Sequence, residues 1–355
     1  MKQILFLSTL SIFFFSCKKE EKKPLKKFIS EVSILQEAKI DSVSIRAIEV
    51  IDNGVYYAAS NGSFGTLSEE GKVGIIGKYV KDSIVPSFRS IAYSGKNLFM
   101  LSVSNPALLY RFTKNDKINS FYESDLVYEE YGEKVFYDSM KFWNEKEGIA
   151  IGDEINGCMS VIITRDGGAT WKKLSCDVLP AMKEGTGAFA ASNTNIAIVD
   201  DKTWMITGGK ESVVLYSPDR GETWSKINTP IIQGGATQGM YSVDFYDDKN
   251  GFAIGGAYDK PNDSLANKVR TQDGGKTWKV VASEKTPGYR SCVQYIPNSS
   301  AQELVAVGFK GITYSNDAGE NWKQLSNEPF YTIRFVNDSI AFAAGKGRIS
   351  KLLFK

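Results

Sequence analysis

Four aspartates occupy the same place in one recurring eight-residue pattern, and they are the first candidates for chemistry in this chain. The pattern begins with Ser or Thr, has Asp third and Gly fifth, and ends in Trp, as around Asp166, Asp219, Asp273 and Asp317. Recurring carboxylates can serve as acids, as bases or as metal ligands. Each of these lies between two short apolar runs, where an Asp accepts hydrogen bonds within its own tight turn. We therefore favour a structural role over a catalytic or metal-binding one.

The composition excludes several kinds of active site. The sequence has no histidine, so Ser-His-Asp and Cys-His mechanisms and His-ligated metals are ruled out. Its four cysteines form no C-x-x-C pair, and no glycine-rich motif opens a helix. A formal net charge of +2 gives no electrostatic footprint for nucleic acid. We assign no catalytic residue, metal or cofactor, and we expect no nucleic-acid partner.

The spacing of the pattern predicts the fold. Its tryptophans, at 171, 224, 278 and 322, lie 53, 54 and 44 residues apart, which is typical of a repeat array such as a propeller. Before each pattern stands a strand that ends in glycine, such as Gly251–Gly255, and another strand precedes that one. One unit therefore reads strand, strand, strand, turn, strand. We predict an all-β β-propeller with four-stranded antiparallel blades.

Counting these units predicts seven blades. Two degenerate units cover residues 44–79 and 88–122, and five more begin near Val135, Thr186, Gly239, Gly288 and Phe330. The last unit holds only three strands, while an unassigned apolar strand, Val32–Gln36, lies at the other end of the chain. Pairing the two would close the ring and remove exposed edges. The prediction is one propeller over residues 31–355.

The eight-residue pattern resembles the Asp box, or BNR repeat, which occurs in sialidases, other glycosidases and many non-catalytic propellers. In that family the box is structural and lies away from the ligand. The matching residues are Asp166, Gly168, Trp171, Asp219, Gly221, Trp224, Asp273, Gly275, Trp278, Asp317, Gly319 and Trp322.

A second resemblance covers residues 135–355. Thr203–Gly209 with Val214–Trp224, and Leu304–Gly308 with Gly311–Trp322, are similar to propellers of the photosystem II stability and assembly factor type. Members of that family are typically binding or assembly factors, and the resemblance implies such a role here.

The N-terminus predicts export and lipidation. Residues 1–16 form a signal peptide with Lys2 before an apolar run from Ile4 to Phe15, which is too short to anchor the chain in a bilayer. Cys17 follows in a context that resembles a bacterial lipobox, and residues 17–30 form a charged, flexible tether. We expect a lipid-anchored, extracytoplasmic protein on the outer membrane, either periplasmic or surface-exposed. The alternative is an ordinary cleaved signal peptide.

The other cysteines suggest one disulfide. Cys158 and Cys176 flank the same predicted hairpin and face each other across it, and an extracytoplasmic location permits a bond. Cys292 lies on an inner strand, where we expect it to be buried.

Six of the seven predicted inner strands carry a recurrent polar residue at their start, on the face opposite the Asp boxes. These candidate ligand-binding residues are Arg46, Arg89, Arg290, Asp138, Tyr241 and Tyr331. Inner strands converge on the propeller axis, so their side chains could ring its mouth, where arginines attract an anionic or carboxylate-bearing partner. The alternative is that the arginines pair with acids of adjacent blades and hold the ring together.

These observations favour a non-enzymatic, membrane-tethered binding or assembly scaffold. We expect a monomer with a protein, anionic or glycan ligand. The alternative is a glycan-binding or sialidase-like glycoside-hydrolase propeller, which would need two acids facing a sugar. The loop acids that could supply them are Asp153, Glu154, Asp259 and Asp263. The Arg-Ile-Pro signature of sialidases is absent; the nearest stretch is Phe88-Arg89-Ser-Ile.

Overall fold

Strands account for all regular secondary structure in the described part of the chain. The computed structural model describes residues 28–52, 54–68, 70–115 and 120–355. The predicted signal peptide, Cys17 and most of the predicted tether lie outside these residues. Where the structure is described, it holds no helix with the length and apolar character needed to cross a membrane.

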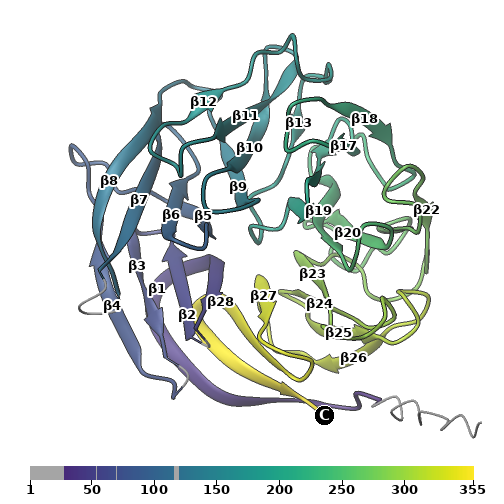
Figure 1. Cartoon of the computed structure of the whole chain (residues 1–355). Coiled ribbons are helices and arrows are strands. Elements are labelled where there is room, and N and C mark those ends of the chain that lie inside the picture. The colour runs from purple at the N-terminus through teal and green to yellow at the C-terminus, as the bar shows by residue number, and fades with distance from the viewer. Residues whose placement is uncertain (1–27, 53, 69, 116–119) are drawn as a thin grey trace, which may run out of the picture.

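The described strands form six hydrogen-bonded sheets around an axis (Figure 1). Because the first strand contributes one half to each of two neighbouring blades, we interpret the sheets as seven four-stranded blades. In the first three blades they are the second half of β1 (Val32–Ile51), β2 (Gly54–Ala59), β3 (Ser63–Leu67) and β4 (Val73–Lys78); β5 (Phe88–Tyr93), β6 (Asn97–Ser102), β7 (Ala107–Asn115) and β8 (Ser120–Glu130); and β9 (Tyr137–Phe142), β10 (Gly148–Ile155), β11 (Cys158–Thr164) and β12 (Lys172–Lys173). In these three blades the order of strands follows the chain, with the first strand innermost.

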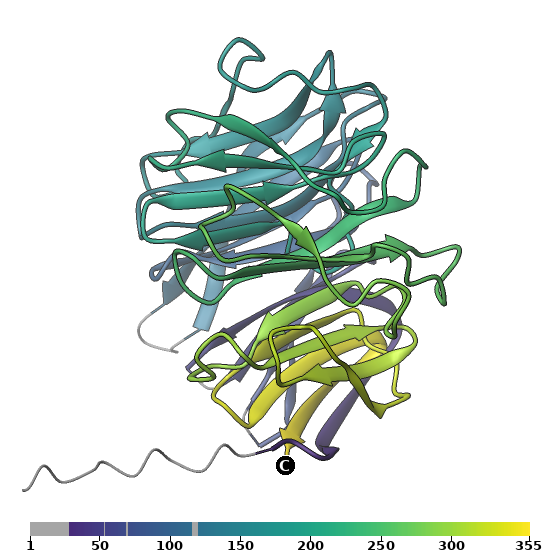
Figure 2. The same cartoon turned by 90° about the vertical axis from the view of Figure 1, so that its right-hand side faces the viewer.

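The remaining blades continue the ring, which Figure 2 shows from its rim. They comprise β14 (Ile196–Val199), β15 (Lys202–Ile206), β17 (Val213–Ser217) and β18 (Ser225–Asn228); β19 (Gln238–Phe245), β20 (Gly251–Ala257), β21 (Lys268–Thr271) and β22 (Lys279–Val280); β23 (Cys292–Tyr295), β24 (Leu304–Gly308), β25 (Gly311–Ser315) and β26 (Lys323–Ser326); and β27 (Thr332–Phe335), β28 (Ile340–Phe354) and the first half of β1. Two short strands, β13 (Thr186–Gly187) and β16 (Gly208–Gly209), pair beside β19.

The two ends of the chain share the seventh blade. β28 folds back on itself, and the N–H of Phe354 at its end donates to the carbonyl of Ser339 at 2.8 Å. β1 then pairs antiparallel with β28 from Val32 opposite Phe354 to Lys39 opposite Arg348 (Figure 1). The N-terminal strand therefore supplies the outer strand of the last blade, as its sequence predicted, and the pairing continues beyond the predicted Val32–Gln36.

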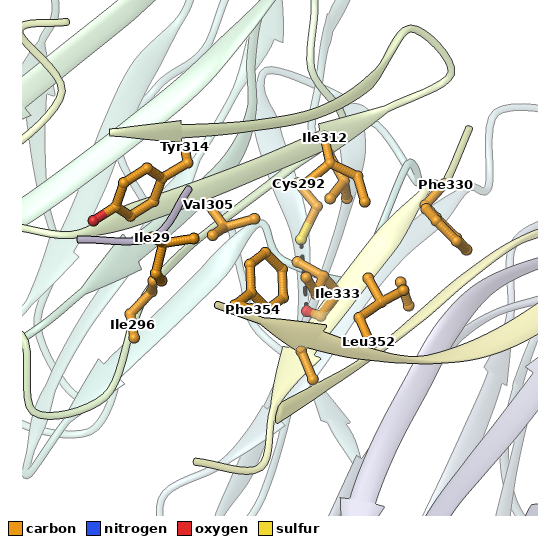
Figure 3. Close-up of a cluster of buried hydrophobic side chains, with 13 residues drawn as sticks. Ile29, Cys292, Ile296, Val305, Ile312, Tyr314, Phe330, Ile333, Leu352 and Phe354 are labelled. Atoms are coloured by element: carbon orange, nitrogen blue, oxygen red, sulfur yellow. Dashed lines mark hydrogen bonds between the residues drawn. The ribbon is translucent and has the colours of Figure 1, made fainter. Parts of the chain in front are cut away.

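A buried apolar cluster fills the space between the sixth and seventh blades (Figure 3). It joins Ile29 from the N-terminus and Phe354 from the C-terminus to Val305 and Ile333 of the two blades. Cys292 lies inside this cluster, fully buried as expected, and its thiol contacts the carbonyl oxygen of Ile333 at 3.9 Å. Closing the ring thus buries apolar surface as well as pairing strand edges.

The four Asp-box turns share one hydrogen-bond pattern. In the first, the Thr164 hydroxyl donates to the Asp166 carboxylate at 2.9 Å and accepts the N–H of Gly168 at 2.9 Å. The carboxylate also accepts the N–H of Thr170 at 3.0 Å. The same three contacts recur in the other boxes, within 2.7–3.0 Å. Each of these aspartates is thus engaged inside its own turn.

The boxes also contact the preceding blade. Gly275 has a φ of +83°, and a Cβ at this position would lie 2.7 Å from the Trp204 indole nitrogen of the fourth blade. That indole donates to the Gly274 carbonyl at 2.9 Å. Of the box tryptophans, Trp171 and Trp278 are buried, while Trp224 and Trp322 are half-buried.

A disulfide joins Cys158 and Cys176, whose Cα atoms are 5.5 Å apart. Cys158 begins β11 and Cys176 follows β12, so the bond closes the hairpin that contains the first Asp box. This is the pairing that their positions in the sequence suggested.

The fourth blade departs from the prediction. The unit was expected to begin near Thr186, but only the two-residue β13 lies there, and the inner strand β14 begins at Ile196. Residues 188–195 between them leave the sheet and bond across the axis. Their partners lie in each of the six other described blades and include Arg46, Arg89, Ser90, Ile91, Met140, Ser242, Ser291, Thr332 and Arg334. We call residues 188–195 the axial segment.

The seventh blade allows a direct test of the seam, by which we mean the paired chain ends and the buried cluster beside them. Phe354→Ala should lower the free energy of unfolding by ~3–5 kcal/mol, because it leaves a cavity where a fully buried ring now packs. Leu353→Ala, on the same strand but half-buried, should lower it by less than half as much. Urea denaturation measures both, and equal losses would contradict the described seam.

Candidate binding site at the propeller axis

A β-bulge sits at the predicted residue in four of the described inner strands. The regular pairing is interrupted at Arg46 in β1, Arg89 in β5, Asp138 in β9 and Tyr241 in β19. A bulge leaves one residue out of the ladder and re-aims its side chain. The four residues therefore lie at the axis because their strands are locally irregular there.

These four residues line one cavity of about 390 Å³. Tyr331 lines it too, so five of the six predicted residues come together. The other side chains of its wall are Phe136, Asp153, Phe189, Ala190, Ala191, Ala236, Tyr258, Tyr289 and Phe309. The cavity opens where inner strands begin, on the face opposite the Asp boxes.

The sixth predicted residue, Arg290, does not line the cavity. Its side chain is buried within the sixth blade, where it donates to the Tyr289 carbonyl at 2.9 Å and to Oε1 of Gln324 at 3.1 Å. Burial lowers the pKa of Arg290 to about 10. These partners are a carbonyl and an amide of its own blade, so Arg290 has a structural role, but among the described residues it does not form the ion pair with an adjacent blade that the alternative expected.

The two remaining arginines bond to the axial segment. Nη1 of Arg46 donates to the carbonyl of Ala191 at 3.1 Å, and Nη1 of Arg89 donates to that of Ala190 at 3.0 Å. Arg46 also lies over the Tyr331 ring, 3.9 Å from its centre, in a cation–π contact. Neither forms an ion pair with an acid of the described chain, so their charges remain available to a ligand.

Burial shapes the electrostatics of this pair. It lowers the pKa of Arg89 to about 10, and the charge of Arg46 adds to the effect. Two guanidinium groups held side by side in a half-buried cavity favour an anion between them.

Two acids of the third blade face the same cavity. Asp138 is fully buried, and its carboxyl lies within hydrogen-bonding reach of the Asp153 carboxyl. Burial, and then the neighbouring carboxyl of Asp153, raise the pKa of Asp138 well above its usual range. Asp153 accepts the N–H of Ala188 at 3.0 Å, and burial raises its pKa as well. A carboxyl that keeps its proton can donate a hydrogen bond to a ligand.

The other loop acids of the sequence lie elsewhere. Glu154 accepts the N–H of Gly157 at 2.7 Å, Asp259 accepts the Thr237 hydroxyl at 2.6 Å, and Asp263 accepts the N–H of Leu265 at 3.0 Å. None of the three lines the cavity. The acids that do line it, Asp138 and Asp153, belong to one blade and stand on one wall.

An aromatic wall was not predicted. Phe189 stacks on Tyr241 with ring centres 4.3 Å apart, Tyr289 meets Tyr241 edge-on at 4.8 Å, and Phe309 lies 5.3 Å from Tyr289. Phe189 has a φ of +60°, a conformation that is unusual for a bulky residue. Apart from Tyr241 of β19, these rings come from loops and the axial segment, which have no counterpart in the repeat pattern.

Comparisons with known proteins bear on the fold. No protein-family model and no curated protein sequence matches this chain. Among solved structures, it is similar to YCF48 bound to D1 peptide (TM-score 0.62, 15% identity, covering 90% of this chain and 94% of that one). It is also similar to the WD40 β-propeller domain of Doa1 (TM-score 0.61, 11% identity, 90% and 96%) and to YCF48 from Cyanidioschyzon merolae (TM-score 0.57, 11% identity, 90% and 98%). These likenesses establish the propeller fold.

The buried acid of the cavity predicts a pH dependence. The folded state raises the pKa of Asp138, so it holds a proton that the unfolded chain releases, and stability falls as the pH rises above the unfolded pKa. Asp138→Asn cannot titrate and resembles the protonated acid. The variant should therefore gain stability relative to the parent protein as the pH rises from 4 to 7. A difference in unfolding free energy that stays constant across this range, measured by urea denaturation, would count against a protonated Asp138.

Proposed function

We propose that the chain is a non-enzymatic propeller that binds a segment of another protein in the axial cavity and so acts as a binding or assembly scaffold. The observation that carries this proposal is the placement of Arg46 and Arg89 by bulges beside an aromatic wall, without acidic partners in the described chain. An arrangement of this kind takes an apolar side chain and a carboxylate or carbonyl together.

The size of the cavity favours a short segment of chain. At about 390 Å³ it lies toward the lower end of ligand pockets, which span ~300–1,000 Å³. It therefore suits an extended peptide or a chain end better than a folded surface. The similarly folded YCF48 has been solved with a D1 peptide bound, which supports a peptide as the class of ligand.

The location of the protein is part of the proposal. We place it outside the cytoplasm, lipid-anchored through Cys17 to the outer membrane, as a monomer. The bond between Cys158 and Cys176 supports an oxidising compartment, because structural disulfides persist there and are rare in the cytosol.

A second candidate is a propeller that binds a glycan. Aromatic rings and a protonated acid beside one cavity are also suited to a sugar. Hydrolysis has less support, because glycosidases place two acids on opposite sides of the bond that is cleaved, whereas Asp138 and Asp153 share a wall.

Site-directed crosslinking tests the peptide proposal. A photo-crosslinking residue at Phe309, on the cavity wall, should capture a protein partner in intact cells, and mass spectrometry should map the crosslink to a short segment of it. Recovery should fall at least 10-fold in Arg46→Ala combined with Arg89→Ala, because the charges that hold the segment are lost.

Lys310→Ala is the matched control, since it removes an exposed positive charge from the same face outside the cavity. Equal recovery by the double variant and the control, with both folded, would overturn the proposal. Capture of polysaccharide in place of protein would favour the glycan candidate.

A further inference from the structure

A second cavity, of about 370 Å³, opens on the opposite side of the axial segment. Ala190 and Ala191 of that segment line the first cavity, whereas Asn193 lines the second. The axis is thus divided into two separate sites. The second lies on the Asp-box face, where its wall includes Trp143, next to Arg165 of the first box.

Charged residues recur at one position of the inner strands, and two of them, Glu49 and Lys141, line the second cavity. Glu49, Lys141 and Asp244 each follow a first-cavity residue by three positions, after Arg46, Asp138 and Tyr241. In the blade between Glu49 and Lys141 the equivalent residue is Ala92, whose methyl group leaves room between them. These charged residues therefore follow the same strand register as the residues that line the first cavity.

Two of the nearby charges are already engaged. Arg334 donates to the Thr332 hydroxyl and the Ile333 carbonyl at 2.8 Å each, and to the carbonyls of Ser192 and Asn193 at 3.2 Å. Asp244 accepts the N–H of Tyr295 at 2.8 Å. These groups hold blades together.

Glu49 and Lys141 are not engaged in this way. Both line the cavity and are half-buried, and neither has a direct hydrogen bond or ion pair with the described residues. Burial raises the pKa of Glu49 and lowers that of Lys141. The other acid that lines the cavity, Asp200, is exposed, so solvent screens its charge. Charges that are shielded from water are costly unless they are paired. The half-buried acid and amine of this cavity therefore suit a partner that carries both opposite charges.

We propose that this cavity binds a small zwitterion of the α-amino acid class, with its carboxylate on Lys141 and its ammonium on Glu49. A simple anion would meet the repulsion of Glu49, and a simple cation that of Lys141. Tyr93, Phe142 and Trp143 line the same cavity and provide apolar surface for a side chain. The site is independent of the protein-binding cavity on the other face.

Calorimetry with L-phenylalanine as the probe tests the proposal on the full chain. The probe should bind with a dissociation constant of about 1 mM or tighter. Two analogues each lack one charge: 3-phenylpropanoate has no ammonium, and phenethylamine has no carboxylate. Each should bind at least 10-fold more weakly, because one buried charge of the cavity stays unpaired.

Variants locate the site. Lys141→Met and Glu49→Gln should each weaken phenylalanine binding at least 10-fold, while Lys96→Met, which removes an exposed lysine on the same face outside the cavity, should leave it unchanged. Thermal unfolding checks that each variant folds, and the analogues decide the question on the parent protein if one does not. No binding of phenylalanine or any other free amino acid at millimolar concentration, equal binding of the analogues, or equal binding by the folded Lys141→Met variant would each overturn the proposal.

Discussion

The axial segment is the constraint on which the rest of this propeller depends. Inner strands that converge on an axis leave their edge groups facing a channel, and buried backbone groups must find partners. Residues 188–195 supply them. The Asn193 side chain accepts from the Ser90 hydroxyl and the Met140 N–H and donates to the Ile91 carbonyl, while the Ser192 hydroxyl donates to the Ser291 carbonyl. One irregular stretch thereby links blades that lie far apart in the sequence.

This crossing also creates both candidate sites. The axial segment crosses the central channel and divides it into two cavities. The walls of both cavities come from the same inner strands. The bulges that re-aim Arg46 and Arg89 place positive charge in the first cavity. Glu49 and Lys141, three positions after Arg46 and Asp138, line the second cavity. The Asp boxes lie outside this arrangement, because their carboxylates are engaged in turns between the two outer strands of each blade.

The sequence predicted what repetition encodes. The β-propeller, the pairing of Val32–Gln36 with the last blade and the link between Cys158 and Cys176 all follow from period and strand pattern, and the structure has each of them. Five axial side chains were placed correctly for the same reason. What has no repeat could not be predicted: residues 188–195 adopt their path through side-chain bonds to six other blades, and Phe189 and Phe309 lie in loops with no counterpart elsewhere. Arg290 was wrongly predicted to face the axis, because the register of a strand does not determine the direction in which a side chain points.

The most direct measurement is the equilibrium unfolding of Asn193→Ala in urea. Removing this amide leaves the buried Met140 N–H and Ile91 carbonyl without their hydrogen-bond partner. Each unsatisfied group costs ~1–3 kcal/mol of stability. The account therefore predicts a loss of at least about 2 kcal/mol, against a change within ~0.5 kcal/mol for the exposed Asn327→Ala. If both variants changed the unfolding free energy equally little, the axial segment would not be the element that holds the blades together.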